Sequence, residues 1–175
     1  DVLGAEVSVN EKVALEVAVG ASVHGMRSMV LAKQVGMNIL ADPLVIAATQ
    51  TIGSGIVVIA GDDLGPKNSQ AEMDSRNFGP LTELPVLDPK DPIALHASIL
   101  EAYRLSEWLR VPAIVRVTPR LLFLEAESIM PSPYAPSGQE FDRAALDLTM
   151  KGRQKNHHDR IMNLAHEESE SPTLK

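Results

Sequence analysis

Residues Val13–Val23 form an almost continuous apolar run, which only Glu16 and Ser22 interrupt. A helix that is apolar on all sides is normally buried on most of them. The pattern therefore predicts a largely buried helix from about Val9 to Gly25, since glycine is favoured just beyond the end of a helix.

The residues before this run carry a signal for the start of a helix. Ser8 followed by Glu11 matches the S-x-x-E capping box, in which both side chains satisfy free backbone N–H groups. Glu11 would then lie at the mouth of a buried helix, where a carboxylate is shielded from water. Two interpretations stay open: Glu11 serves only as a capping partner, or it faces a ligand.

Short apolar runs alternate with further helical patterns along the chain. The predicted strands are a short β-prone segment at Ala5–Val9, then Arg27–Ala32, Ile56–Ala60, Pro85–Leu87 and Ala113–Val117. The predicted helices between them are Ile39–Thr51, Ser69–Asn77 and Pro92–Arg110. This alternation is typical of the α/β class and predicts a three-layer fold, a parallel sheet with helices on both faces.

Parallel sheets bind ligands in the loops that follow the carboxyl ends of their strands. Three predicted loops qualify, and they are Lys33–Asn38 with Gly36 at its centre, Gly61–Gln70 and Thr118–Arg120. In the polar segment after the second loop, Glu72 is spaced to pair with Arg76 on a helix, whereas Asp74 would point elsewhere. These charged residues form either a structural network or part of a binding site. Gly53-Ser54-Gly55 precedes a strand, so it predicts a turn and not a dinucleotide-binding motif.

The amino-acid composition of the sequence changes after Leu124. Met130–Gly138 is rich in proline and predicts a linker. The polar region that follows contains the basic cluster Lys151–Arg160, with His157 and His158 predicted on a solvated surface. We therefore divide the chain into an α/β domain, residues 1–124, and a linker with a polar helical arm, residues 125–175.

Composition narrows the possible functions. The chain has 175 residues, a formal net charge of -7 and no cysteine. The negative charge argues against a nucleic-acid partner. The missing cysteines exclude disulfides, a cysteine nucleophile and cysteine-bound clusters within these residues, and they favour a cytoplasmic location. The uncharged stretch Pro43–Gly61 is interrupted by polar and glycine residues, so a membrane span is not expected.

Several sequence blocks strongly resemble one family, the α subunit of indolepyruvate:ferredoxin oxidoreductase. This is a thiamine-diphosphate enzyme of the 2-oxoacid oxidoreductase superfamily. The blocks include N-E-K-V-A-L-E-V-A-V-G-A-S, K-Q-V-G-M-N-I-L-A-D-P-L and D-D-L-G-P-K-N-S-Q-A-E-M-D-S-R, and together they lie at Asn10–Ser22, Lys33–Leu44, Asp62–Arg76, Leu84–Pro92 and Val111–Arg120.

The resemblance implies the thiamine-diphosphate-binding fold, with this region as its pyrimidine-binding domain. Glu11 matches the family's acid at the start of the helix, whose implied role is to hydrogen-bond N1′ of the aminopyrimidine and so promote its function as a base. Gly36, Met37 and Asn38 would lie beside the cofactor rings, where glycine permits a close approach of the backbone. No metal ligand is expected in this chain.

The same resemblance implies partners. A diphosphate-binding domain or subunit would share thiamine diphosphate and supply Mg²⁺, and a ferredoxin-type subunit would supply iron–sulfur clusters. The complex, an oligomer, would oxidatively decarboxylate an arylpyruvate-type 2-oxoacid, pass electrons to ferredoxin and form acyl-CoA. The family's first strand and its G-Y-P-G-T-P-type loop are missing, so we expect an N-terminally incomplete domain that is inactive alone. Two alternatives stay open, a thiamine-dependent 2-oxoacid decarboxylase subunit and a non-catalytic scaffold.

Overall fold

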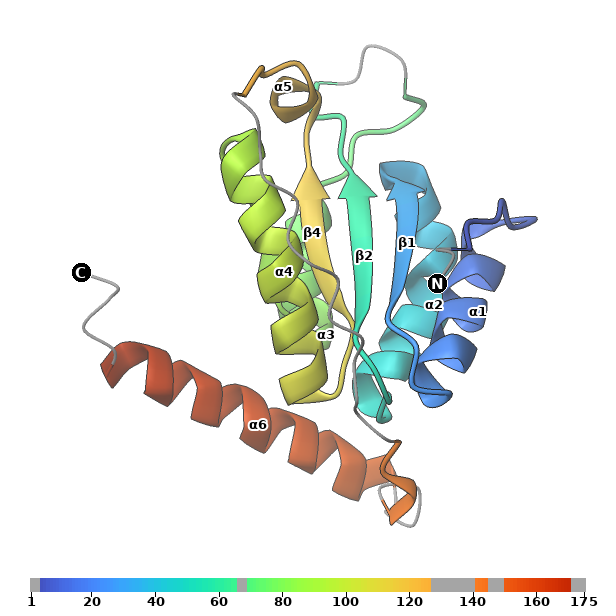
Figure 1. The fold of residues 1–175 in the computed structure, drawn as a ribbon, viewed down its shortest axis with the longest axis vertical. Coiled ribbons are helices and arrows are strands. Elements are labelled where there is room, and N and C mark those ends of the chain that lie inside the picture. Colours follow the sequence, from blue (N-terminus) through green and yellow to red (C-terminus); the bar gives the residue numbers. More distant parts are fainter. Residues whose placement is uncertain (1–3, 66–68, 127–140, 145–149, 171–175) are drawn as a thin grey trace.

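The structure is a computed structural model that describes residues 4–65, 69–126, 141–144 and 150–170. Its centre is a four-stranded, all-parallel sheet in the order β1-β2-β4-β3 (Figure 1). The strands are β1 (Ser28–Lys33), β2 (Ile56–Gly61), β3 (Val86–Leu87) and β4 (Ala113–Val117). The predicted linker at Met130–Gly138 lies outside the described residues.

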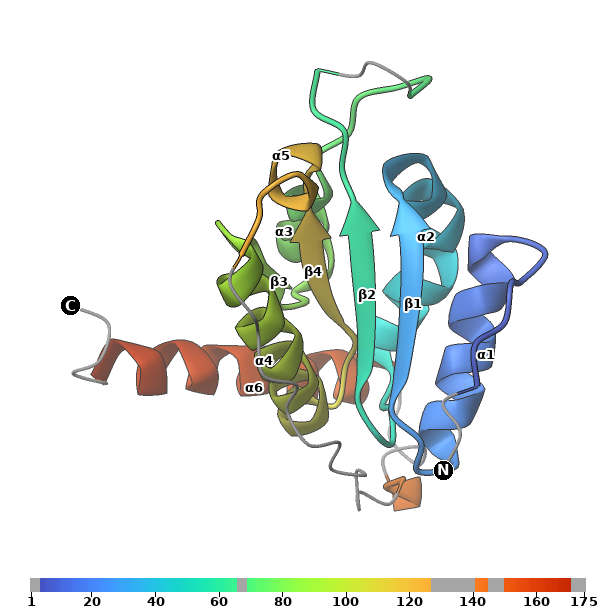
Figure 2. The same ribbon diagram turned by 45° about the horizontal axis from the view of Figure 1, so that its top comes forward.

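Helices cover both faces of this sheet. They are α1 (Glu11–Val23), α2 (Gln34–Thr49), the 3-10 turn η1 (Ser75–Asn77), α3 (Phe78–Thr82), α4 (Pro92–Leu109), α5 (Pro119–Leu122) and α6 (Met150–Glu170). Figures 1 and 2 show α1 and α2 on one face, α4 on the other, and α6 across the end where the strands begin. The predicted three-layer α/β architecture is thus confirmed.

The strand register aligns the ends of three strands at the edge of the sheet where ligand binding is predicted. Lys33 at the end of β1 pairs with Gly61 at the end of β2, which in turn pairs with Val117 at the end of β4. The chain segments that follow these three strands therefore leave the sheet side by side, at the edge toward which all the arrows in Figure 1 point.

Two apolar clusters hold the layers together. On one face, sheet residues such as Val30 and Val58 pack with Leu15 of α1 and Leu40 of α2. On the other face, Val57, Ala113 and Val115 pack with Ala102 of α4. Alternate residues of β2 thus contribute to opposite clusters, as expected for a strand buried on both faces.

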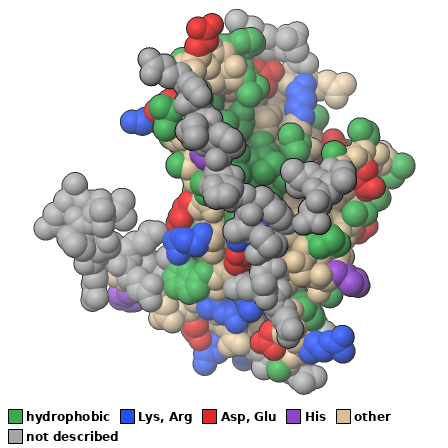
Figure 3. Space-filling view, viewed as in Figure 1, with side chains coloured by type: hydrophobic (Ala, Val, Ile, Leu, Met, Phe, Trp, Pro, Cys, Tyr) green, Lys and Arg blue, Asp and Glu red, His purple; other side chains and the backbone are tan. Residues whose placement is uncertain are grey.

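The described residues leave part of the second face of the sheet exposed. Met29 and Leu31 of β1 point to the side on which α4 packs, but α4 contacts β2 and β4. Met29 is 41% exposed and Leu31 is 72% exposed. Figure 3 shows hydrophobic side chains gathered at the surface beside α4.

The first helix differs from its prediction at its start. It begins at Glu11, and Asn10 is the capping residue, because its side chain accepts a hydrogen bond from the backbone N of Val13 at 2.9 Å. The predicted capping box with Ser8 is therefore wrong. The end of the helix agrees with prediction: Gly25 has φ +82, and its N donates to the carbonyl of Ser22.

The predicted burial of this helix is also wrong. Only Leu15, Ala18 and Ser22 of α1 are buried. Val17 is 49% exposed, so α1 buries a single face and leaves apolar residues on the other. The β-prone segment at Ala5–Val9 forms no strand.

The turn before β2 is locked to the end of α1. The Ser22 hydroxyl donates to the carbonyl of Ser54 at 2.5 Å and accepts from the backbone N of Gly53 at 3.1 Å. A methyl group on Gly53 would lie 3.0 Å from the Ser22 carbonyl carbon and 3.3 Å from Cα of Val23, both backbone atoms.

We therefore expect Gly53→Ala to lower the free energy of unfolding by about 3 kcal/mol, since the backbone of α1 must shift to make room. The control is Gly20→Ala in the middle of α1, where an added methyl group meets nothing within 4 Å. That change should stabilise the helix by about 1 kcal/mol. Urea unfolding of the purified chains measures both, and equal stability of the two variants would contradict the collision.

No helix within the described ranges combines the length and the apolar character that crossing a membrane requires.

Candidate functional site

The candidate site lies at the carboxyl edge of the sheet, where α1 and α2 both begin. Glu11 is the first residue of α1, and Gly36 belongs to the first turn of α2. The Glu11 side chain rests directly on Gly36: a Cβ at position 36 would lie 2.7 Å from both Cγ and Cδ of Glu11. A Cβ at this position would displace the Glu11 side chain, so the structure brings together two of the predicted site residues.

The predicted loop at Lys33–Asn38 is wrong. α2 begins at Gln34, immediately after the last residue of β1. Gly36, Met37 and Asn38 are therefore helical residues. The Met37 side chain is fully buried in the core, whereas Asn38 is exposed. Of these three, Gly36 contacts Glu11, Met37 has only its backbone available to a ligand, and Asn38 presents its side chain to solvent.

The electrostatics of this corner suit an acidic side chain. Glu11 is partly buried in the first turn of its own helix. Its carboxyl group also lies against the first turn of α2, whose start has no side-chain hydrogen bond from its capping residue. The first backbone N–H groups of a helix lack partners within the helix and carry partial positive charge. Glu11 thus lies between two such ends while one side stays accessible.

Next to this corner, the segment after β2 is tied to α2 by Gln34. The Gln34 side chain is fully buried. Its Oε1 accepts from the backbone N of Asp63 at 2.6 Å, and its Nε2 donates to the carbonyl of Ala71. Asp63 of the predicted ligand loop Gly61–Gln70, and Ala71 just after this loop, are thus held beside the start of α2.

Further along the same edge lies a buried ionic network centred on Asp62. This carboxylate is 2% exposed. It accepts from Nε of Arg116 at 2.6 Å, and from the hydroxyl and backbone N of Ser75 at 2.5 and 2.9 Å. Arg116 also donates to Asp88 at 3.0 Å. Burial opposes the charge of Arg116, but its hydrogen bonds to Asp62 and Asp88 raise its pKa above the ordinary value.

Sequence reasoning missed this network, although one signal was present. Arg116 is a charged residue within β4, a strand whose five residues are all buried. A buried charge requires a partner, and the carboxylates that follow neighbouring parallel strands are within its reach. The same argument could have selected Asp62 and Asp88.

The predicted pairing of Glu72 with Arg76 is wrong. Arg76 instead bonds Asp74, with Nε of Arg76 2.9 Å from both carboxylate oxygens. Glu72 accepts from the backbone N of Gly65 at 3.1 Å. The predicted helix Ser69–Asn77 is wrong: only its last three residues are helical, as the 3-10 turn η1, so α-helical spacing does not apply to Glu72 and Arg76. The hydrogen bond from Arg76 lowers the pKa of Asp74 to about 2.

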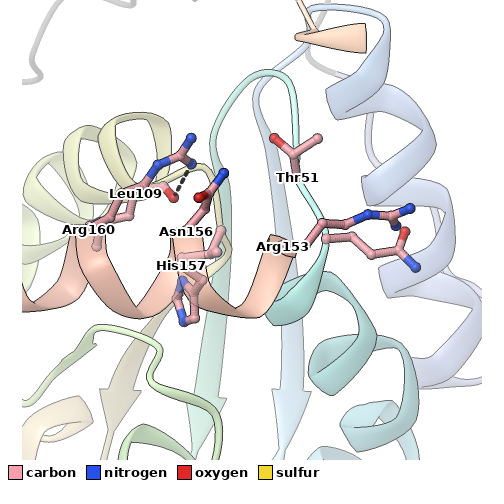
Figure 4. Close-up of a pocket in the computed structure, with 8 residues that line it drawn as sticks. Thr51, Leu109, Arg153, Asn156, His157 and Arg160 are labelled. Carbon is pink, nitrogen blue, oxygen red and sulfur yellow. Dashed lines mark hydrogen bonds between the residues drawn. The ribbon is translucent and has the colours of Figure 1, made fainter. Parts of the chain in front are cut away.

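At the opposite edge, α6 packs across the ends of α2 and α4. A shallow pocket between them is lined by Arg153, Asn156, His157 and Arg160 of α6 together with residues near Thr51 and Leu109 (Figure 4). Arg160 donates to the carbonyl of Leu109 at 3.2 Å. The basic cluster thus contacts the carbonyl end of α4, which carries partial negative charge.

The predicted solvated position of His157 is wrong. His157 is 7% exposed, and its Nε2 lies 3.3 Å from the carbonyl of Thr82. His158 is exposed and contacts Glu83 at 2.9 Å. Within the described ranges, Nδ1 of His157 has no hydrogen-bond partner, and no group of three or more acidic, histidine or cysteine side chains could hold a metal ion.

Burial lowers the pKa of His157 below its usual value of 6.5, and the nearby Arg160 acts in the same direction. The packed state therefore binds fewer protons than the unfolded state, so its stability falls as the pH drops below about 6.5. We expect the protection of α6 amides against hydrogen exchange, corrected for the intrinsic pH dependence of exchange, to fall over this range, and His157→Leu to remove most of this loss. Glu83→Gln removes the exposed contact with His158 and also the attraction of the Glu83 carboxylate that raises the pKa of His157, so it should keep or enlarge this loss. An unchanged pH response in His157→Leu would contradict this prediction.

No family model matches the chain. Similar proteins are nevertheless found among curated sequences. Indolepyruvate oxidoreductase subunit IorA from Methanothermobacter marburgensis is 39% identical over 116 residues, which are 66% of this chain and 19% of that protein. The IorA of Archaeoglobus fulgidus is 41% identical over 116 residues, with the same shares. That of Pyrococcus horikoshii is 32% identical over 125 residues, 71% of this chain and 19% of the relative. The chain thus spans about one fifth of the length of these relatives.

Proposed function

The chain belongs, over the 66% of it that matches, to the family of indolepyruvate oxidoreductase subunits IorA, and from this premise we propose that it forms the pyrimidine-binding part of a thiamine-diphosphate-dependent 2-oxoacid oxidoreductase. The observation that carries the proposal is the contact between Glu11 and Gly36 at the carboxyl edge of the sheet. This edge is where open α/β sheets bind ligands.

The residues present fit an aminopyrimidine. Glu11 offers a partly buried carboxyl group with one accessible side, and Gly36 has no Cβ that would displace it. Thiamine diphosphate, when bound, supplies the carbon nucleophile and the electron sink for 2-oxoacid decarboxylation.

In this proposal Glu11 orients the ring and holds a proton at its N1′ atom, which makes the opposite amino group a better base. The backbone of Gly36 and Met37 lines the ring, and the exposed amide of Asn38 offers a further polar contact. The buried side chain of Met37 supports the first turn of α2 from the core side.

The rest of the reaction requires other parts of the protein. We propose that a diphosphate-binding domain or subunit supplies Mg²⁺ ligands, and that a ferredoxin-type iron–sulfur subunit carries electrons away. The substrate is a 2-oxoacid of the arylpyruvate type, the acyl acceptor is coenzyme A, and the complex works in the cytoplasm as an oligomer. Residues 1–124 form the pyrimidine-binding domain, and residues 125–175 form a linker and arm.

The experiment is to purify the complete oxidoreductase and measure its thiamine diphosphate content, reduction of ferredoxin with a 2-oxoacid, and formation of acyl-CoA. The proposal expects all three. Release of an aldehyde without reduction of ferredoxin would identify a thiamine-dependent decarboxylase instead. Failure to bind thiamine diphosphate would leave a non-catalytic scaffold.

A further inference from the structure

Gln34, the first residue of α2, has a fully buried polar side chain. A primary amide offers both an acceptor and donors. Both ends are used here: Oε1 accepts from the backbone N of Asp63 at 2.6 Å, and Nε2 donates to the carbonyl of Ala71. Burying such a group is costly unless its hydrogen bonds are made, so the amide is present for these two bonds.

The two partners belong to opposite ends of one loop. Asp63 lies two residues after the end of β2, and Ala71 lies near the other end of the loop, before η1. Within the loop, the Ser69 hydroxyl donates to Asp63 at 2.8 Å, and the backbone N of Gly65 donates to Glu72 at 3.1 Å. Residues 66–68 lie outside the described part. The Gln34 side chain thus joins the two described ends of the loop through a single rigid group.

Gln34 also belongs to the corner that contains Glu11. It is the first residue of α2, two positions before Gly36, on which Glu11 rests. Because a helix is rigid over one turn, the loop ends are fixed relative to Glu11 through Gln34. No other described side chain bonds both α2 and this loop.

We propose that Gln34 is a positioning residue, which locks the loop ends Asp63–Gly65 and Ser69–Ala71 beside Glu11 so that they form a second wall of the thiamine diphosphate site. The proposal rests on the proposed function of this site. Gln34 itself touches no cofactor atom: it acts through the loop backbone.

Two substitutions of similar size separate its roles. Gln34→Met removes both hydrogen bonds and leaves the loop backbone groups without a partner, a loss that corresponds to about tenfold in an equilibrium constant. We expect the affinity of the cofactor-depleted oxidoreductase for thiamine diphosphate to fall on the order of tenfold. Hydrogen exchange at residues 63–65 and 69–72 should accelerate in the same variant, with α2 unchanged.

Gln34→Glu should restore both hydrogen bonds only when its carboxyl group is protonated. An ionised carboxylate still accepts from Asp63 but cannot donate to Ala71, whereas a protonated carboxyl group does both. A buried carboxyl group takes up its proton readily as the pH falls. The affinity of this variant, relative to wild type, should therefore recover severalfold between about pH 8 and about pH 6, and Gln34→Met should show no recovery.

Ser106→Ala is the matched control, because Ser106 is also fully buried and uses both its donor and its acceptor, but at the opposite edge of the sheet. It should lower stability without changing cofactor affinity or loop exchange. Wild-type affinity and exchange in Gln34→Met would overturn the proposal, as would a loss in Ser106→Ala equal to that in Gln34→Met. If wild-type protein bound no thiamine diphosphate, the proposed function would fail, while the exchange measurement would still decide whether Gln34 holds the loop.

Discussion

Glu11→Gln in the complete oxidoreductase should lower the rate of 2-oxoacid-dependent ferredoxin reduction by about 10²–10⁴-fold, the usual contribution of a positioned acid or base. Glutamine has nearly the same shape and fits over Gly36 as the carboxyl group does. It cannot share a proton with N1′ of the ring. We therefore expect thiamine diphosphate to remain bound while the turnover number falls.

The matched control is Glu16→Gln, which lies on the same helix but is exposed to solvent. That variant should keep wild-type turnover and cofactor content. Steady-state reduction of ferredoxin, together with the thiamine diphosphate content of each purified variant, measures both effects. Turnover near the wild-type value in Glu11→Gln would refute the assigned role.

Asp62→Ala should have the largest effect on stability, a loss of about 3–5 kcal/mol in the free energy of unfolding. The substitution removes the carboxylate that accepts from buried Arg116 and from Ser75. The guanidinium keeps its hydrogen bonds to the more exposed Asp88 and a longer ion pair with Asp74 at 3.6 Å, and the start of η1 loses its hydrogen bonds to the residue after β2. A buried charge that loses a partner costs far more than an exposed one.

Asp42→Ala provides the comparison. The Lys12–Asp42 pair is formed at the surface, with side chains 44% and 60% exposed. Its removal should cost at most about 1 kcal/mol. Chemical denaturation followed by circular dichroism measures both variants, and similar losses in the two would show that the Asp62 network does not stabilise the fold.

The sequence was sufficient for the α/β architecture because strands and helices differ in their apolar pattern. β2 and β4 are short runs of mainly β-branched residues, with Arg116 as the one charge in β4, and α4 begins at Pro92 as predicted. These patterns are local in sequence. The same local patterns predicted which three chain segments follow the carboxyl ends of the strands.

The errors arose where contacts distant in sequence decide the structure. Lys33–Asn38 resembles a loop because it is polar and contains glycine, but Gly36 is there to accommodate Glu11. His157 lies in a charged stretch, yet contact with Thr82 buries it. Asp74 pairs with Arg76 because the backbone forms a 3-10 turn instead of a regular helix.

The candidate site was only partly predictable for the same reason. Local patterns singled out Glu11 and Gly36, the family resemblance implied their roles beside the cofactor, and their contact was not deducible from spacing. Gln34 and Arg116 gave weaker signals, since each is a polar residue next to or within a buried strand. Their partners became evident only once the strand order was known.

The strand order also affects how the chain folds. Each pairing in the sheet is parallel, so no neighbours are joined by a tight hairpin, and closing β2 against β4 must bring together segments separated by η1, α3, β3 and α4. Such long-range closure makes folding slow. The corner of Glu11 and Gly36 joins consecutive helices and should form early, whereas the link from Asp62 to Arg116 must await the last crossover. Folding intermediates of this protein should therefore contain the contact between Glu11 and Gly36 before the ion pair between Asp62 and Arg116 has formed.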